Sequence, residues 1–228
     1  MNTNPRLILV GGWEFTKDDG IDAEIAKLAG GKMVLIPNAS KLPEKQVERA
    51  REKYIQYQTE ILLLEDNVTA LPEGVRVVYF GGGRPEKLVE YFANRLELFA
   101  DIKNKWERGE IIWCGSSTGA MVVFPQMLAN DSRGEGGTEL VPGIGLIKNN
   151  AFVIPHWDKD HGDPSWRERI VTAHEDKLII TLDEYTALFW GDKESGVVGL
   201  GTVRIFDGGK EKGVYENSKA ISNLSLFT

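Results

Sequence analysis

The chain has 228 residues, of which 42% are hydrophobic, and a formal net charge of −7. This length and composition allow one large domain or two small ones with an ample core. The acidic balance and the lack of a basic stripe argue against nucleic acid as a partner. No apolar run reaches the ~18 residues of a membrane span, so no membrane association is expected.

The single cysteine, Cys114, bears on the compartment of the protein. One cysteine excludes an internal disulfide framework and is typical of a reducing environment. The N-terminal residues do not have the pattern of a signal peptide. The sequence therefore predicts a cytoplasmic protein.

The first two-thirds of the chain alternates short apolar runs with amphipathic stretches. Strands are predicted at residues 6–10, 33–37, 60–64, 75–80 and 110–114. Helices are predicted at residues 22–28, 43–57, 86–102 and 119–128. This βαβ order predicts an α/β three-layer sandwich, with a mostly parallel sheet and helices on both faces.

The last third of the chain has a different pattern. Strand-like runs occur at residues 151–154, 178–182, 187–190, 197–200 and 203–206, and one helix is predicted at residues 165–173. Short polar turns join these strands, which predicts an antiparallel C-terminal extension of the sheet. Because no repeat or linker interrupts the chain, we predict a single domain over residues 1–228.

The apolar run at residues 111–114 leads directly into a Gly-x-Ser-x-Gly pentad, residues 115–119. A strand, a sharp turn with a central serine and a following helix form a nucleophile elbow. Gly115 and Gly119 supply the small residues that this turn needs around Ser117, and the helix N-terminus favours a developing negative charge. The pattern indicates an acyl-transfer hydrolase, and a plain small-residue turn is the alternative.

A second glycine-rich turn, residues 81–83, also follows a strand and precedes a helix. It fits neither the dinucleotide-binding pattern nor a phosphate-binding loop with Gly-Lys-Ser/Thr. Ligands of parallel sheets bind at the carboxyl ends of the strands, so this loop and the elbow can face one cleft. A backbone N–H of the loop and that of Thr118 would then form a two-donor oxyanion hole.

Three histidines are candidates for a general base: His156, His161 and His174. His156 follows an apolar strand at the same sheet edge and is the best placed, whereas His174 falls among charged residues at a helix end. His161 lies in an acidic loop that could bind a metal together with His156, but its spacing matches no metal motif. We therefore expect no metal and no organic cofactor.

The carboxylate that would orient the base is open from the residues alone. Asp131, Asp183 and Glu184 are the candidates. Asp131 follows the helix of the elbow, and it would restore the Ser, acid, His order of α/β-hydrolases at an unusually short separation. Asp183 and Glu184 follow a predicted strand, so either could reach the active edge.

Four segments together resemble the serine peptidase family that contains dipeptidase E (α-aspartyl dipeptidase) and cyanophycinase. They are residues 80–83, 114–120, 154–157 and 182–188, and they occur in the family's order. The elbow and the Asp-Glu-x-Thr-Ala-Leu segment are the specific parts. The resemblance implies a fold similar to class I glutamine amidotransferases, with serine in place of cysteine at the elbow.

The resemblance also implies roles for individual residues. Ser117 resembles the nucleophile, His156 the general base and Glu184 the carboxylate that orients the histidine. Gly83 and Thr118 resemble the oxyanion-hole donors. An Asn-Asp pair of dipeptidase E matches residues 130–131, which implies a supporting role for Asp131.

Departures from the family pattern concern the substrate. Thr118 and Trp157 replace the usual alanine and phenylalanine, and neither change removes a backbone N–H. Arg84 and Pro85 stand where the family has a short polar pair after the glycines, which puts aspartyl specificity in doubt. Arg167 and Arg169 resemble an Arg-Glu-x-Arg stretch of dipeptidase E that meets the acidic group of the substrate. The alternative for these two arginines is a solvated helix face.

The leading prediction is a serine peptidase that cleaves small, acidic peptides, as a monomer or homodimer. An esterase with the same elbow and a non-catalytic amidotransferase-like module that binds a metabolite are the alternatives. The match at all three triad positions argues against the binding module. The Ser, His, Glu order favours the peptidase over the esterase.

Overall fold

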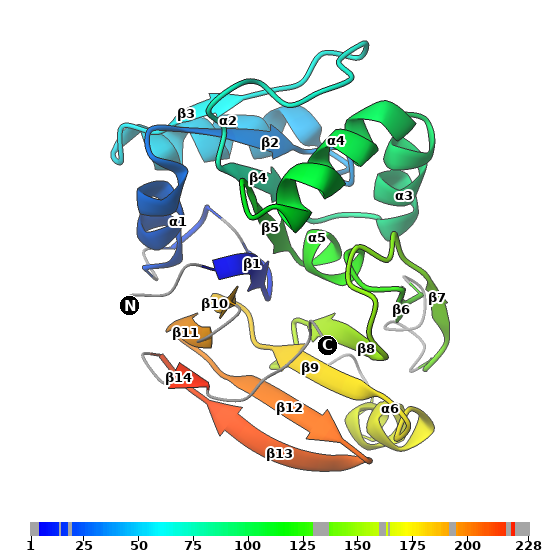
Figure 1. Ribbon diagram of the computed structural model, residues 1–228. Helices are drawn as coiled ribbons and strands as arrows, with labels where there is room; N and C mark the ends of the chain where they lie inside the picture. Colours follow the sequence, from blue (N-terminus) through cyan, green and yellow to red (C-terminus); the bar gives the residue numbers. More distant parts are fainter. Residues whose placement is uncertain are drawn as a thin grey trace.

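The fold is described by a computed structural model, which covers residues 5–13, 15–17, 20–129, 137–159, 163, 165–191, 195–217 and 220–221 (Figure 1). Its central sheet has eight strands in the order β14-β11-β10-β1-β5-β4-β2-β3. The strands of the parallel part are β1 (Pro5–Val10), β2 (Lys32–Ile36), β3 (Glu60–Leu62), β4 (Val77–Phe80) and β5 (Ile112–Ser116). At one edge β10 (Thr186–Gly191), β11 (Ser195–Gly199) and β14 (Ala220–Ile221) continue the sheet with antiparallel pairing.

Helices cover both faces of this sheet. On one face lie α1 (Ile21–Ala29) and α2 (Pro43–Ile55), and on the other lie α3 (Pro85–Ala93), α4 (Leu96–Glu107) and the short α5 (Thr118–Met121). Along β1, Leu7 and Leu9 pack into one core while Ile8 and Val10 pack into the other, as the two-residue period of a strand requires. The predicted three-layer α/β sandwich is confirmed.

The C-terminal third forms more than an extension of the central sheet. A second sheet has the order β13-β12-β9-β8, and a small two-stranded sheet joins β6 and β7. The elements are β6 (Gln126–Leu128), β7 (Leu140–Pro142), β8 (Ala151–Pro155), α6 (Trp166–Ala173), β9 (Leu178–Leu182), β12 (Val203–Asp207) and β13 (Lys210–Tyr215). In Figure 1 the second sheet lies below the parallel strands, with α6 near one end. The antiparallel extension is therefore confirmed for β10 and β11, and β14 adds a strand that was not predicted. The strands predicted at 151–154, 178–182 and 203–206 belong to the second sheet, in which β8 and β9 pair in parallel.

Two predicted helices are wrong in extent. The helix expected at residues 86–102 is interrupted between α3 and α4, where the Arg95 backbone leaves helical geometry (φ −139°, ψ 57°). The Arg95 guanidinium lies 2.7 Å from an Asp66 carboxylate oxygen and 4.3 Å from the centre of the Tyr91 ring, and these contacts favour the break. The helix expected at 119–128 is only α5, because the chain soon reaches Pro125, which has no N–H to donate, and then enters β6.

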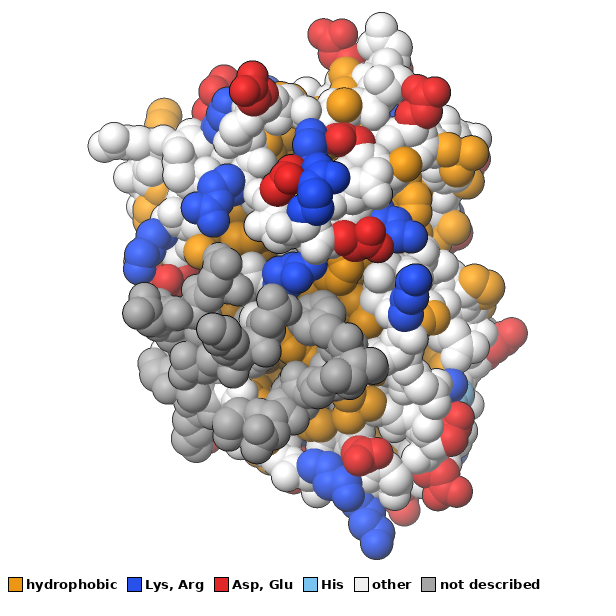
Figure 2. All heavy atoms as spheres, in the orientation of Figure 1, with side chains coloured by type: hydrophobic (Ala, Val, Ile, Leu, Met, Phe, Trp, Pro, Cys, Tyr) orange, Lys and Arg blue, Asp and Glu red, His pale blue; other side chains and the backbone are white. Residues whose placement is uncertain are grey.

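The surface charges and the helices bear on two expectations from the sequence, that the protein binds neither nucleic acid nor a membrane. On the face in Figure 2, basic and acidic side chains lie next to one another, with hydrophobic side chains between them. None of the helices in the described residues is both long and apolar enough to cross a bilayer.

Candidate active site

The Gly-x-Ser-x-Gly pentad forms a sharp turn between β5 and α5. Ser117 has φ 50° and ψ −107°, a region that non-glycine residues rarely occupy. A Cβ on Gly115 would lie 2.1 Å from the Gly119 carbonyl oxygen, and one on Gly119 would lie 2.2 Å from that of Phe80. Both glycines are therefore required by close backbone contacts, and the geometry is that of a nucleophile elbow rather than a plain turn.

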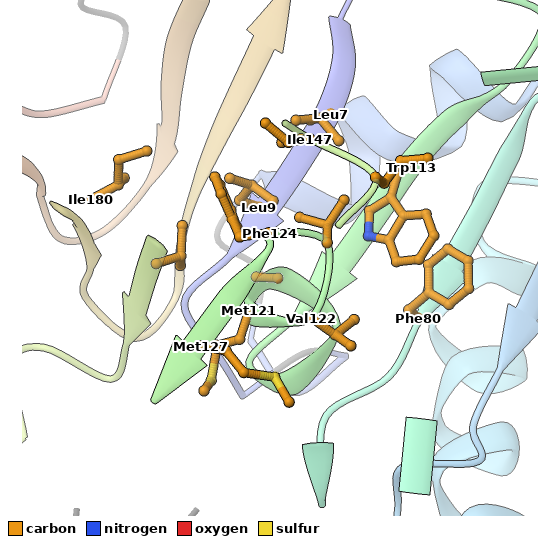
Figure 3. Packing of buried hydrophobic residues seen from close by; sticks show 14 of the residues in the cluster. Leu7, Leu9, Phe80, Trp113, Met121, Val122, Phe124, Met127, Ile147 and Ile180 are labelled. Atoms are coloured by element: carbon orange, nitrogen blue, oxygen red, sulfur yellow. The ribbon is translucent and has the colours of Figure 1, made fainter. Parts of the chain in front are cut away.

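A buried pair of aromatic side chains packs against this turn. Phe80, the last residue of β4, stacks on Trp113 of β5 with ring centres 3.5 Å apart (Figure 3). The Trp113 indole N–H donates a hydrogen bond of 3.0 Å to the Gly119 carbonyl. Because Trp113 is fully buried, this bond fixes α5 relative to the sheet.

His156 follows the last residue of β8 and has φ 57°. Its backbone N–H donates to the Gly11 carbonyl at 3.0 Å, which attaches the turn to the end of β1. A Cβ on Gly12 would lie 2.1 Å from Cε1 of the imidazole. The Gly11-Gly12 pair therefore leaves the space that the histidine ring occupies.

The structure brings the three predicted triad residues together. Nε2 of His156 lies 2.9 Å from the Ser117 hydroxyl oxygen, and Nδ1 lies 2.8 Å from Oε1 of Glu184. Both distances are those of hydrogen bonds. The three side chains thus form a Ser-His-Glu relay that links β5, β8 and the turn after β9.

The neighbouring Asp183 faces elsewhere. Its Oδ2 accepts hydrogen bonds from the backbone N–H and the hydroxyl of Thr202, at 2.8 and 2.7 Å. Successive side chains of an extended segment point to opposite sides, which explains why only Glu184 of this pair reaches His156. Asp131 lies outside the described residues.

The Glu184 carboxylate is buried but has several donors. Oε1 also accepts a hydrogen bond from the Trp13 indole N–H, and Oε2 lies 2.7 Å from Nζ of Lys159. Burial acts to raise the pKa of Glu184, but the hydrogen bonds from Lys159, His156 and Trp13 outweigh it and hold that pKa below its usual value. The group is therefore an anion at neutral pH, as the orienting member of a triad must be.

The two predicted oxyanion-hole residues lie on adjoining segments. Gly83 has φ 147°, and a Cβ there would lie 1.9 Å from the Ala39 carbonyl oxygen, so only glycine fits. The Thr118 hydroxyl donates a 2.6 Å hydrogen bond to the Gly83 carbonyl. The Thr118 side chain thus joins the glycine loop to the elbow, beside the Ser117 hydroxyl.

A cavity of about 330 Å³ opens beside Ser117 and His156. Segments after β1, around the start of α2 and after β4 supply the rest of its lining: Trp13, Phe15, Thr16, Ser40, Lys41, Leu42, Lys45, Gln46, Arg49, Gly82 and Gly83. The charged members are three cations, Lys41, Lys45 and Arg49, and no carboxylate lines the cavity among the described residues. We call these three side chains the basic wall.

The three arginines expected to meet the substrate lie elsewhere. Arg84 lines a separate cavity, of about 620 Å³, against α3 and the β6–β7 pair. Arg167 donates to the backbone carbonyls of Trp157 and Lys159, at 2.6 and 3.0 Å. Arg169 lies 2.7 Å from an Asp163 carboxylate oxygen. None of the three lines the cavity beside Ser117, so the expectation that they meet the substrate does not hold for this cavity.

Several residues of the site are not evident from the sequence. The basic wall, Trp13 and Lys159 are missed because they sit on loops or a helix start with no motif. A usable signal existed for Trp13, which directly follows the glycine pair at the carboxyl end of β1, the strand next to the elbow strand. Among the described residues, which include His156 but not His161, no group of three or more His, Cys, Asp or Glu side chains could hold a metal ion.

Comparison with known proteins assigns the family. Residues 7–198 match the family model of peptidase family S51. The chain belongs to peptidase family S51. It is 30% identical over 168 residues to a cyanophycinase of Geminocystis herdmanii (strain PCC 6308), a match that covers 68% of this chain and 60% of that protein. The chain thus spans less than two thirds of this curated relative's length.

Two solved structures of other proteins have a fold similar to that of this chain. A peptidase from an acI-B1 Actinobacterium has a TM-score of 0.75 at 24% identity, over 95% of this chain and 96% of that one. A putative peptidase E protein from Listeria monocytogenes EGD-e has a TM-score of 0.59 at 17% identity, over 85% of this chain and 98% of that one. At these identities the likeness concerns the fold alone.

Proposed function

We propose that this S51 chain is a serine peptidase that hydrolyses an amide bond of small peptides through Ser117, His156 and Glu184. The observation that supports this most directly is the hydrogen-bonded relay, 2.9 Å from Ser117 to His156 and 2.8 Å from His156 to Glu184. The strained Ser117 backbone and the glycine loop beside the hydroxyl are what an acyl-transfer site requires.

In the proposed reaction Nε2 of His156 removes the Ser117 hydroxyl proton as the oxygen attacks the scissile carbonyl. The negative charge of the tetrahedral intermediate is stabilised by the backbone N–H groups of Gly83 and Thr118. His156 then gives its proton to the departing amine, which leaves an ester on Ser117. Water repeats these steps and releases the acid, while Glu184 holds the imidazole in one tautomer and stabilises its protonated form.

We further propose that the preferred substrates carry an acidic side chain, and that the basic wall binds it. Lys41, Lys45 and Arg49 line the cavity at Ser117 and stand in a chain with a net charge of −7. Cations are the groups that attract a carboxylate, and an arginine can bind one through two parallel hydrogen bonds. This assigns acidic recognition to residues other than Arg84, Arg167 and Arg169.

A panel of substrates separates the peptidase from its alternatives. We expect hydrolysis of dipeptides, with Asp-X, Glu-X and β-linked aspartyl peptides among the best substrates, and no hydrolysis by Ser117→Ala. Turnover of acyl esters without any dipeptide would indicate an esterase. Binding of peptides without turnover would indicate a binding module.

The basic wall has a matched control within one helix. Arg49 lines the cavity, whereas Arg51 lies two residues further along α2 and does not. Because the wall is exposed to solvent, Arg49→Met should lower kcat/KM for Asp-X relative to Asn-X by about 10-fold, the lower end for a charged hydrogen bond. Arg51→Met should leave this ratio unchanged. An unchanged ratio in Arg49→Met, Lys45→Met and Lys41→Met would contradict the assignment of acidic recognition to the basic wall, and equal kcat/KM for Asp-X and Asn-X in the wild type would contradict the acidic preference.

A further inference from the structure

The four-residue turn that begins at His156 is attached to the segment around Glu184 at several points. The Trp157 N–H donates to the Leu182 carbonyl at 3.0 Å, and Oδ1 of Asp158 accepts from the Glu184 N–H at 2.8 Å. The last residue of the turn, Lys159, reaches the carboxylate itself. The base and its orienting acid are therefore held together by more than their own hydrogen bond.

The two oxygens of Glu184 have different partners. Oε1 faces His156 and Trp13, and Oε2 faces the Lys159 ammonium at 2.7 Å. The Glu184 side chain is 4% exposed and that of Lys159 is 49% exposed, so the lysine extends from the surface and ends on a buried anion. Such a lysine closes the solvent side of the carboxylate and limits its rotation.

We propose that Lys159 is a positioning residue of the active site, which acts through Glu184 on His156. It holds the carboxylate so that Oε1 meets Nδ1, and its charge opposes part of the field that Glu184 exerts on the imidazole. This inference rests on the proposed function, because it assumes that His156 is the base for Ser117. Lys159 touches no reacting atom in this arrangement.

Among the described residues, other charged groups also lie near the pair, and they include Arg167, which donates to the carbonyls of Trp157 and Lys159. Asp158 has a carboxylate oxygen 3.9 Å from Nζ of Lys159. The Lys17 ammonium lies 4.0 Å from the centre of the ring of Tyr185, the residue that follows Glu184. The hydrogen bond to Glu184 raises the pKa of Lys159, which agrees with the lowered pKa of Glu184. Lys159 is the cation among these described groups that an ion pair joins to the carboxylate directly.

Replacing this lysine by methionine has two separable consequences. The carboxylate gains freedom to rotate, which should lower the rate of serine acylation about 10-fold, between the effects of an exposed ion pair and of a buried charged hydrogen bond. The imidazolium also loses a nearby repelling cation. Its apparent pKa, and with it the acid limb of the rate profile, should move up by about 0.5 pH unit.

The experiment measures the second-order rate of inactivation by a fluorophosphonate between about pH 5 and 9. This probe reports Ser117 reactivity and needs no known substrate. We expect Lys159→Met to show both the lower rate and the upward shift, and Lys159→Arg to restore both. Lys177→Met should match the wild type, because the Lys177 ammonium contacts Asp176 and Asn150 and Lys177 precedes β9, whereas Glu184 follows that strand.

Arg167→Met is the control for a purely structural effect. Arg167 holds the same turn through the carbonyls of Trp157 and Lys159. Because its guanidinium binds these carbonyls rather than the Glu184 carboxylate, its loss should lower the rate and move the acid limb upward less than Lys159→Met does. The inference is overturned if Lys159→Met behaves as wild type, if Lys159→Arg fails to restore the profile, or if Arg167→Met shifts the limb equally. Failure of the wild type to react at all would instead contradict the proposed function.

Discussion

Gly12→Ala tests the position of the base more sharply than removal of the base itself. The added Cβ would lie 2.1 Å from Cε1 of His156 and 2.7 Å from both ring nitrogens, which is inside the volume of the imidazole. The ring must therefore leave its place between Ser117 and Glu184. Since triad members act as a unit, we expect a loss of activity on the order of 10⁴-fold.

The same substitution also strains the backbone, and this effect needs its own control. Gly12 has φ 127°, where an alanine costs about 1–3 kcal/mol. Gly31 has φ 103°, and a Cβ there would meet nothing within 4 Å. Gly31→Ala should therefore lose stability of the same order in thermal unfolding and keep its activity.

The assay compares kcat/KM and fluorophosphonate labelling in the two variants at a temperature where both are folded. Near wild-type activity in Gly12→Ala would show that His156 does not act from the observed position. Equal loss of activity in Gly31→Ala would also contradict the prediction, since the effect would then come from stability alone.

Three further predictions concern the triad. Ser117→Ala should abolish hydrolysis while Ser116→Ala keeps most activity, as measured by kcat; a dead Ser116→Ala would contradict the register of the elbow. Glu184→Gln should lower kcat about 10³-fold or more, whereas Asp183→Asn should chiefly lose stability, about 1–2 kcal/mol in denaturant unfolding, from its bonds to Thr202. The pKa of Glu184 is lower in the folded state than in the unfolded state, so the ionised carboxylate stabilises the fold above the unfolded-state pKa of about 4.3. This stabilisation is lost as the pH falls through the folded-state pKa. The Tm difference between wild type and Glu184→Gln should therefore narrow below about pH 4. A difference that stays constant down to pH 3 would contradict that linkage.

The parts of the site that the sequence predicted are those set by local chemistry and by strand ends. Ser117 was found from the spacing of two glycines, and His156 from its place after an apolar strand. Parallel strands bring their carboxyl ends to one edge, so both could be expected near the glycine loop. The choice of Glu184 over Asp183 needed the family resemblance as well as the alternation of side chains.

The parts that the sequence did not predict depend on contacts between distant segments. Lys159 and Trp13 matter only because two loops converge on Glu184, and no local pattern marks that convergence. Arg167 and Arg169 are expected at the substrate from the sequence. In the structure the Arg167 guanidinium binds the turn that follows His156, and the Arg169 guanidinium binds Asp163. The basic wall lies at the start of α2, far along the chain from the elbow.

Some features of the fold also depend on contacts between distant segments and could not be predicted from local sequence. The strands at residues 178–182 and 187–190 have similar apolar patterns, yet β9 joins the second sheet and β10 the central one. Strand pairing is decided by the packing of whole sheet faces, so the sequence of a single strand does not show which strand it pairs with. The break at Arg95 depends on Asp66, which lies in a different loop. The single domain, the cytoplasmic location and the monomeric or dimeric state stay predictions.

The most direct test of the central claim is mass spectrometry of the protein after reaction with a fluorophosphonate. We expect one adduct per chain, on the hydroxyl of Ser117, and none in Ser117→Ala or His156→Ala. An unlabelled wild type, or an adduct on a different serine such as Ser116 or Ser40, would contradict it.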